Sequence, residues 1–314
     1  MWSELVFLCV IDELSEYAFT ITKLFIWKKK RILLTVSVIT SSIREFLMEN
    51  SWIEQSDTIR LGCFVAAFIL FALVEYKWPR KKLTQKKSLR WVNNLGLIVF
   101  NSIVLRLALP LLAIDAAYIA QQENFGVFNY LGTPYFLTFL LSILLLDWII
   151  YWQHRAFHRV PSLWRLHRMH HSDQDIDLTT GTRFHPVEII LSMLIKIAAI
   201  GILGIPVEAV IVFEIILNVS AMFNHSNLHI PRWLDRYIRT LLITPDVHRV
   251  HHSIHVTEMN NNYGFFLSIW DRIGKTYLVR PRDGHEDMKI GTALFRSEKE
   301  QRLDKMLTQP FRKK

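Results

Sequence analysis

Cysteine is scarce in this sequence, and several common catalytic motifs are missing. Only two cysteines occur, Cys9 and Cys63, and they form no CxxC pair. This excludes a zinc site built from thiolates and a scaffold held by disulfides. No histidine begins a His-Glu-x-x-His motif, which argues against a zinc hydrolase of that kind, and no GxGxxG segment is present for a dinucleotide. Internal repeats and low-complexity linkers are also absent.

Apolar residues, in contrast, make up 51% of the 314 residues, and the mean hydropathy is positive. Such a composition is unusual for soluble domains of this length and favours a membrane protein. The net charge of +9 would suit an anionic surface or a nucleic acid, but most Lys and Arg residues lie between apolar stretches. We therefore expect a lipid bilayer, and no nucleic acid, as the partner.

Three apolar stretches, 59–76, 95–115 and 134–152, are each long enough to cross the roughly 30 Å hydrocarbon layer as a helix. The connection 77–93 carries seven Lys and Arg residues, whereas the connection 116–131 carries none. The positive-inside rule then predicts that 77–93 is cytoplasmic and that the third span delivers the rest of the chain to the cytoplasmic face.

Residues 187–217 are mostly apolar but contain Gly201, Gly204 and Pro206. This stretch is too long for one ordinary span and predicts a hairpin of two shorter helices that returns to the cytoplasmic side. Residues 1–58 form an N-terminal segment of unclear role, without the basic start of a cleaved signal peptide. We expect a membrane-embedded catalytic domain over 59–280 and a polar, solvated C-terminal tail over 281–314.

Thirteen histidines occur, and all but His285 lie between residues 154 and 255. Three groups have the spacing i, i+4 or i, i+3, i+4: His154 and His158; His167, His170 and His171; His248, His251 and His252. On a helix such offsets bring side chains within about 6 Å of one another, as two imidazoles on one metal require. Adjacent histidines diverge by about 100° and can serve different metals. Eight imidazoles exceed the needs of one ion, which favours a two-metal site.

Other residues extend this constellation. His225 and His229, again at i, i+4, are further candidate ligands, and His185 is a candidate neighbour of the site. Asp147 shares one stripe with the first histidine pair and is a tentative catalytic residue that would orient a ligand imidazole. Its alternative role is a structural pair with Arg106, which also lies inside a span.

Acidic and apolar residues near these groups have weaker signals. The segment 175–177 and Glu258 could accept hydrogen bonds from ligand imidazoles, but solvated loop acids are the favoured interpretation. Side chains that could line a lipid tunnel, or simply pack, are Met193, Phe213, Met222 and Phe223.

Imidazole ligands suit iron, zinc, copper or nickel, so affinity alone does not choose the metal. A metal pair at the membrane boundary, beside apolar helices, can address aliphatic chains, whose carbon–hydrogen bonds have no acid–base chemistry available. Oxygen activated by iron reaches such bonds, which favours iron here.

The order HxxxH, HxxHH, apolar hairpin, HxxHH resembles the fatty acid hydroxylase and sterol desaturase superfamily. The segments that begin at Trp164, Arg183, Phe223, Thr244 and Trp270 resemble the branch that includes bacterial members and the alkylglycerol monooxygenases. The likeness covers roughly residues 59–290. It departs at Gly274 and Lys275, where family members commonly have Phe-Gly.

The resemblance implies an all-α polytopic membrane protein with about four to five membrane or hairpin helices and a cytoplasmic, histidine-rich helical cap. It further implies two iron ions, molecular oxygen as co-substrate and a lipid or sterol-like substrate. The sequence leaves open whether a purified sample would contain iron or the tighter-binding zinc. Because the chain has no redox cofactor motif, we expect a separate electron-transfer protein. The predicted location is a membrane crossed several times, the inner membrane if the source is bacterial.

The leading hypothesis is therefore a hydroxylase of alkyl chains, with desaturation as the less favoured reaction on the same scaffold. A metal transporter would be expected to carry histidines along its spans, but none occurs between 59 and 153. A non-catalytic membrane protein with an adventitious metal-binding patch is the remaining alternative.

Overall fold

A computed structural model describes residue 53 and residues 55–312 of the chain. Helices are the only regular elements in this part of the chain, joined by three isolated β-bridges. The predicted all-α class is therefore confirmed. Most of the N-terminal segment 1–58 lies outside the described residues.

The membrane part contains α4 (Ser56–Lys77), α5 (Lys87–Ala108), α6 (Ala113–Gln122), α7 (Val127–Tyr130), α8 (Tyr135–Arg159), α10 (Pro186–Leu203) and α11 (Val207–His225). The other elements are α9 (Pro161–His171), η1 (Leu178–Thr182), α12 (Arg232–Leu241), α13 (Pro245–His251), α14 (Val256–Met259), α15 (Ile269–Ile273), α16 (Gly284–Asp287), η2 (Glu298–Gln301), α17 (Leu303–Met306) and η3 (Gln309–Phe311).

Five helical stretches of the described chain are long and apolar enough to cross a membrane: α4, the stretch that begins with α5, α8, α10 and α11. The predicted second span, 95–115, is misplaced. Its helix α5 begins at Lys87 and ends at Ala108, because Leu109 precedes Pro110 and adopts an extended conformation (φ −122°, ψ 126°). A residue before proline is driven out of the α region by the proline ring, so the helix stops there.

The predicted hairpin is present as α10 and α11, although α11 continues to His225. Gly204 makes the turn with φ of +71°, a conformation that glycine adopts at little cost. A Cβ atom at this position would lie 2.6 Å from the carbonyl oxygen of Phe125. The turn therefore needs glycine both for its backbone angle and for its close packing.

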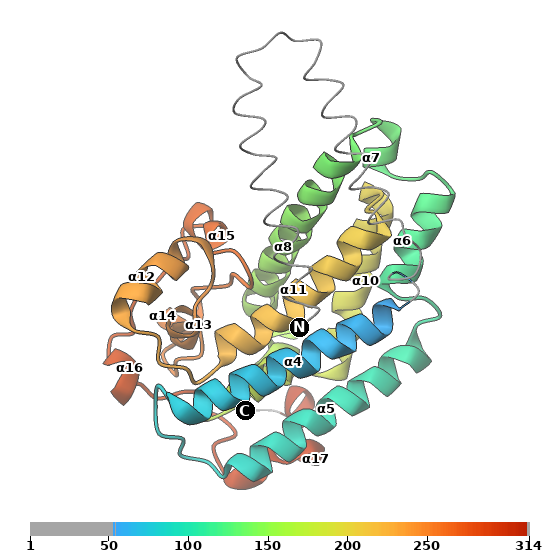
Figure 1. The fold of residues 1–314 in the computed structure, drawn as a ribbon. Coiled ribbons are helices and arrows are strands. Elements are labelled where there is room, and N and C mark those ends of the chain that lie inside the picture. The colour runs from blue at the N-terminus through green and yellow to red at the C-terminus, as the bar shows by residue number, and fades with distance from the viewer. Residues whose placement is uncertain (1–52, 54, 313–314) are drawn as a thin grey trace, which may run out of the picture.

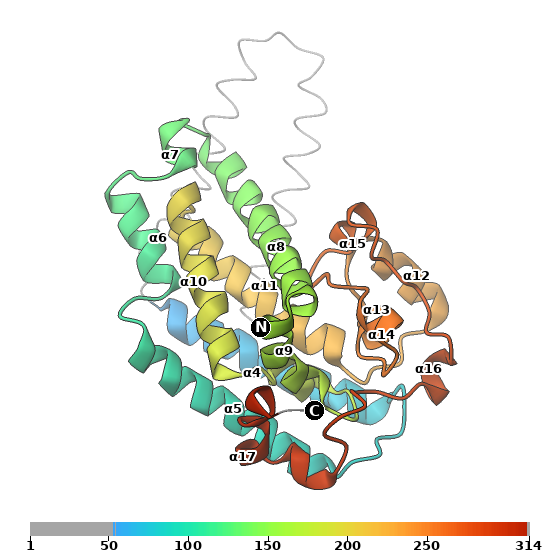
Figure 2. The ribbon, with the colours of Figure 1, turned by 180° about the vertical axis from the view of Figure 1, so that it is seen from behind.

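Helices α9 and α13, which carry five of the histidines, lie near the ends of α8 and α11 that point away from α7 (Figures 1 and 2). Helices α8, α10 and α11 run from the end marked by α7 toward α9 and α13, while α4 and α5 pack across them. Buried apolar side chains of α6, α8, α10 and α11 form the main core, among them Leu146, Ile200, Val210 and Phe213. The short helices α9 and α13 pack against α8 and α11 and form, with the loops around them, the histidine cap.

The basic connection 77–93 contacts this cap. Arg80 Nε donates to Asp246 of α13 at 3.1 Å, and the backbone N–H of Thr84 donates to Asp175 at 2.8 Å. Arg90 is fully buried and binds both carboxylate oxygens of Asp173 at 2.8 Å. The connection and the histidine helices therefore lie on one side of the helical core.

The C-terminal segment differs from the predicted solvated tail. Its residues Gln301, Met306 and Gln309 are completely buried. Ser172 Oγ, just after α9, donates to Gln309 Oε1 at 2.7 Å, and Arg183 Nη1 donates to Gln301 Oε1 at 2.8 Å. The tail thus packs against α9, and its polar side chains satisfy buried partners rather than water.

Candidate metal centre

Nine buried histidines form two adjacent groups. The first histidine group contains His154, His158, His167, His171 and His251, and the second contains His170, His225, His248 and His252. Within each group, one ring nitrogen of every member lies within 4.8 Å of those of the others. The groups touch, since the ring centroids of His171 and His252 are 4.5 Å apart.

Four helices deliver these side chains, and their termini follow local sequence signals. Pro161 and Pro245 stand at the first positions of α9 and α13, where a proline costs no hydrogen bond and its fixed φ suits a helix. Helix α8 continues past its apolar run to carry the first pair, and α11 ends on His225. Neighbouring histidines in α9, offset by about 100°, enter different groups.

Acceptor oxygens hold the Nδ1 atoms of four of these histidines. His154 Nδ1 donates to the carbonyl of Tyr263 at 2.9 Å, and His251 Nδ1 donates to the carbonyl of Asn261 at 2.7 Å. His225 Nδ1 donates to the carbonyl of its own helix at residue 221, at 2.7 Å. His167 Nδ1 lies 2.6 Å from a carboxylate oxygen of Glu188. Because carbonyl oxygens only accept, the first three rings carry their proton on Nδ1.

The Nε2 atoms of His154, His225 and His251 consequently present lone pairs, and those of His154 and His251 face each other. His154 Nε2 lies 3.1 Å from His167 Nε2 and 3.0 Å from His251 Nε2. In the second group, His225 Nε2 lies 3.2 Å from His170 Nε2 and 3.0 Å from His248 Nε2. The two lone pairs of His154 and His251, at 3.0 Å, repel each other unless a cation lies between or beside them. The donor set therefore fits metal ions.

Burial keeps the imidazoles in the neutral form that metals need. It lowers the pKa of His167 to about 3, and burial together with neighbouring imidazoles lowers the pKa of His251 well below its ordinary value. Both ring nitrogens of His158, His171 and His252 are buried without a hydrogen-bond partner. Buried polar atoms are rarely left unpaired, so these nitrogens are also suited to bind a metal ion. Imidazole nitrogens suit iron, zinc, copper or nickel.

The carboxylate next to the ligands is Glu188, which sequence reasoning missed. It is buried in the first turn of α10, and its Oε1 lies 2.6 Å from His167 Nδ1. Histidine ligands commonly donate their second N–H to such a carboxylate, which fixes the tautomer and the ring orientation. The sequence did contain one indication of this role: Glu188 follows His185 by three residues and lies at the start of an apolar helix.

Asp147, predicted to orient an imidazole, binds elsewhere. Its two oxygens accept hydrogen bonds from the backbone N–H groups of Phe266 and Leu267, at 3.3 and 3.1 Å, and from Trp270 Nε1 at 2.7 Å. It therefore fastens a loop to α8. That loop also carries the carbonyl of Tyr263 that holds His154, so Asp147 supports the first histidine group through the backbone.

Two further predicted residues lie outside both groups. His229 is exposed, and its backbone N–H donates to the carbonyl of Trp78 at 2.9 Å. His185 caps α10, where its Nδ1 accepts from the backbone N–H of Val187 at 3.2 Å. The structure brings neither imidazole to the metal-binding nitrogens.

The acids expected in solvated loops are buried instead. Asp177 pairs with Arg90 and caps η1, and Asp175 accepts the backbone N–H groups of Thr84 and Gln85. Glu258 accepts the backbone N–H of Arg282 at 2.6 Å. These carboxylates accept hydrogen bonds from backbone N–H groups and from Arg90, and they do not contact the imidazoles of the two groups.

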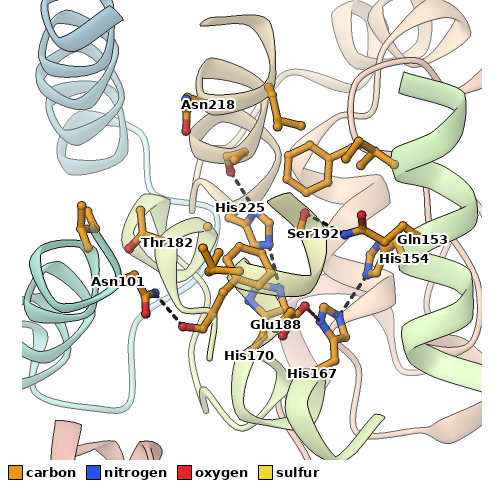
Figure 3. Close-up of a pocket in the computed structure, with 18 of the residues that line it drawn as sticks. Asn101, Gln153, His154, His167, His170, Thr182, Glu188, Ser192, Asn218 and His225 are labelled. Carbon is orange, nitrogen blue, oxygen red and sulfur yellow. Dashed lines mark hydrogen bonds and ion pairs between the residues drawn. The ribbon is translucent and has the colours of Figure 1, made fainter. Parts of the chain in front are cut away.

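A cavity of about 300 Å³ opens beside the two groups, between α4, α5, α8, α10 and α11 (Figure 3). His154, His167, His170, His225 and His248 form one end of it. Its apolar walls include Phe64, Ile98, Leu105, Phe184 and Phe265. The predicted tunnel residues Met193, Phe213, Met222 and Phe223 are not among its lining residues, and Phe213 and Met222 are buried in packed clusters.

Comparison with known proteins agrees with this geometry. Residues 139–276 match the fatty acid hydroxylase family. The chain is 24% identical to ornithine lipid hydroxylase OlsE of Rhizobium tropici, over 72% of this chain and 69% of that protein. It is 29% identical to human alkylglycerol monooxygenase and 26% identical to human lathosterol oxidase. These matches cover 51% and 55% of this chain but only 35% and 56% of the two human proteins. No solved structure matches.

The chain is thus a helical membrane protein whose buried histidine groups are typical of diiron oxidoreductases. The matched residues 139–276 carry all nine histidines of the two groups and identify an enzyme domain of the fatty acid hydroxylase superfamily.

Proposed function

We propose that this enzyme hydroxylates a carbon–hydrogen bond in the alkyl portion of a lipid, fatty acid or sterol-like substrate, with molecular oxygen as co-substrate. One observation carries the proposal: the apolar cavity between the membrane helices ends on imidazoles of both histidine groups. An alkyl chain in this cavity would lie next to the imidazoles that would hold the metal ions. The names of the relatives, a lipid hydroxylase and a monooxygenase, support the same class of reaction.

Two iron ions, held by the nine histidines of the two groups, would supply the oxygen activation that unactivated carbon–hydrogen bonds require. The protein contributes a fixed set of neutral imidazoles, oriented by the carbonyls of Tyr263 and Asn261 and by Glu188. The apolar walls hold the chain and exclude water from the reacting carbon.

The proposed reaction consumes one O2, two electrons and two protons. One oxygen atom enters the carbon–hydrogen bond to give an alcohol, and the other leaves as water. A separate electron-transfer protein would supply the electrons, since the sequence has no haem-binding or dinucleotide motif.

Mass spectrometry of lipids extracted from cells with and without the protein tests this proposal. We expect a lipid that gains one oxygen, labelled when the cells grow under ¹⁸O₂. His251→Ala should abolish the gain, whereas the matched variant His229→Ala, which alters an exposed histidine, should retain it. A loss of two hydrogens would indicate a desaturase instead, and unchanged lipids under aerobic, reducing conditions would contradict both reactions.

We further propose that the metal centre faces the cytoplasm. The lysine- and arginine-rich connection 77–93 contacts the histidine helices, for example through Arg80 and Asp246, and such connections remain cytoplasmic. Asn124 and Lys82 are both exposed. A membrane-impermeant thiol reagent applied to intact cells should label the Asn124→Cys variant but not the Lys82→Cys variant. The opposite labelling pattern would contradict this orientation.

A further inference from the structure

Helix α12 shows the reverse of the usual burial pattern. Asp235 is its one buried residue, at 6% exposure, and pairs with Arg239 one turn later. The apolar side chains point outward instead: Trp233 is 66% exposed, Tyr237 is 70% exposed and Leu241 is 62% exposed. These three residues have the spacing i, i+4, i+8 and therefore form one stripe along the helix. Exposure of such a stripe to water is unfavourable, and exposed apolar patches commonly mark a binding surface.

The neighbouring helix α15 also exposes apolar side chains. The two helices are held together because Ser268 Oγ donates to the carbonyl of Arg239 at 3.0 Å and the backbone N–H of Ser268 donates to that of Leu241 at 2.9 Å. Helix α15 adds Ile269, which is 42% exposed, and Ile273, which is 66% exposed. We call the exposed apolar surface of α12 and α15 the docking patch; it consists of Trp233, Leu234, Tyr237, Leu241, Ile269 and Ile273.

The docking patch is fastened to a membrane span. Asp147 of α8 accepts hydrogen bonds from residues 266 and 267 and from Trp270 of α15. Asp147 stands seven residues before His154, which is about 10 Å along the helix, in the direction of the apolar run. Both views place α15 beside α8, on the α7 side of α13 (Figures 1 and 2). The patch therefore lies nearer the hydrocarbon layer than the metal centre does.

The surroundings of the patch also suit a membrane surface. On α8 itself, Trp148 and Trp152 are 42% and 45% exposed, and tryptophan is enriched at the membrane interface. Arg232 and Arg236 are exposed on the polar side of α12, where their guanidinium groups can bind lipid phosphates. An apolar stripe flanked by arginines is the arrangement of helices that lie in the interfacial plane of a bilayer.

We infer that α12 and α15 form an interfacial docking surface, which binds the head-group region of an anionic bilayer with its apolar side chains toward the lipid chains. This surface would fix the depth and tilt of the histidine cap relative to the membrane. The inference rests on exposure and charge outside the metal centre and stands whichever reaction the centre performs.

Electron paramagnetic resonance of the whole protein in phosphatidylcholine–phosphatidylglycerol vesicles tests the inference. Both native cysteines are first replaced by serine. A nitroxide label is then attached to one introduced cysteine, either in Tyr237→Cys or in Arg236→Cys, which alters the sequence neighbour. Collisions with dissolved oxygen, which concentrates in the hydrocarbon, are compared with collisions with water-soluble chromium oxalate. We expect the oxygen-to-chromium ratio at Tyr237 to exceed that at Arg236 several-fold.

Two outcomes would overturn the inference. Equal ratios, with ready access of chromium oxalate at both positions, would mean that the patch faces water. Shielding of Tyr237 from both reagents would mean that a protein covers it, either a second copy or an electron-transfer partner. Native-like metal content and thermal stability of each labelled variant are required before its ratio is compared, and the same labels at Trp233 and Arg232 provide a second pair.

Discussion

Removal of the Glu188 carboxylate should weaken one of the two metal sites. Its Oε1 lies 2.6 Å from Nδ1 of His167, whose other nitrogen belongs to the first histidine group. Without this acceptor, the buried Nδ1–H of His167 loses its partner, and the ring loses the contact that fixes its tautomer and orientation. Among the described residues, no member of the second histidine group forms a hydrogen bond with Glu188, so the metal of that group should remain bound.

The size of the effect follows from the hydrogen bond. A bond to a charged group is worth about 1.5–3 kcal/mol, and a neutral bond is worth roughly half as much. Glu188→Gln, which keeps the shape and a neutral acceptor, should therefore cost about 1 kcal/mol, or roughly a fivefold higher dissociation constant for one metal. Glu188→Ala should cost about 2–3 kcal/mol, or a dissociation constant for that metal roughly 30- to 150-fold higher.

Anaerobic competition between the purified protein and a ferrous chelator measures these affinities. Glu258→Ala is the matched control, because Glu258 is equally buried but accepts from the backbone N–H of Arg282 and not from a histidine. We expect it to bind both metals with wild-type affinity. The reasoning would be refuted if Glu188→Ala bound both metals normally, or if Glu258→Ala lost as much affinity as Glu188→Ala.

Three other changes have defined outcomes in thermal unfolding of the metal-loaded protein. Asp147→Asn removes the charge that binds three donors and should cost about 2 kcal/mol, with both metals retained. Gln309→Ala removes a buried side chain that accepts from Ser172 Oγ and donates to the carbonyl of Glu300, and should cost about 1–3 kcal/mol, a fall of several degrees in Tm. Burial lowers the pKa of His285 to about 4, so its contribution to stability is complete above its ordinary pKa and is lost as the pH falls toward 4. Between about pH 7.5 and pH 5.5, the free energy of unfolding should therefore fall by about 1 kcal/mol less in His285→Gln than in the wild type.

Each of these outcomes has a clear opposite. Loss of a metal from Asp147→Asn would mean that this carboxylate acts on a ligand and not on the loop. An unchanged Tm in Gln309→Ala would show that the tail does not stabilise α9. Equal acid sensitivity of His285→Gln and wild type would rule out the proposed titration.

Much of the fold was predictable because the helices are driven by apolar stretches, which the sequence records locally. The boundaries that failed depend on finer signals. The second span was placed too late because its apolar run extends beyond Pro110, while the helix must stop at Leu109. The tail was predicted to be solvated because its residues are polar, yet Gln301 and Gln309 are buried against partners distant in sequence.

The carboxylates show the same division. Asp147 and Glu188 both lie on apolar helices, and spacing favoured Asp147 because it shares a stripe with His154. In the folded chain, Asp147 faces the loop at 266–270, whereas packing of α10 against α9 brings Glu188 to His167. Sequence spacing describes one helix at a time, and contacts between helices depend on how they pack.

The sequence alone determined the membrane class, the helical hairpin and the eight histidines of the HxxxH and HxxHH motifs, because helix periodicity and hydropathy are local properties. Tertiary structure alone divided the histidines into two groups, added His225 to one and left His229 exposed. It also formed the apolar cavity and the outward-facing stripe of α12, since burial and cavity shape depend on segments far apart in the chain.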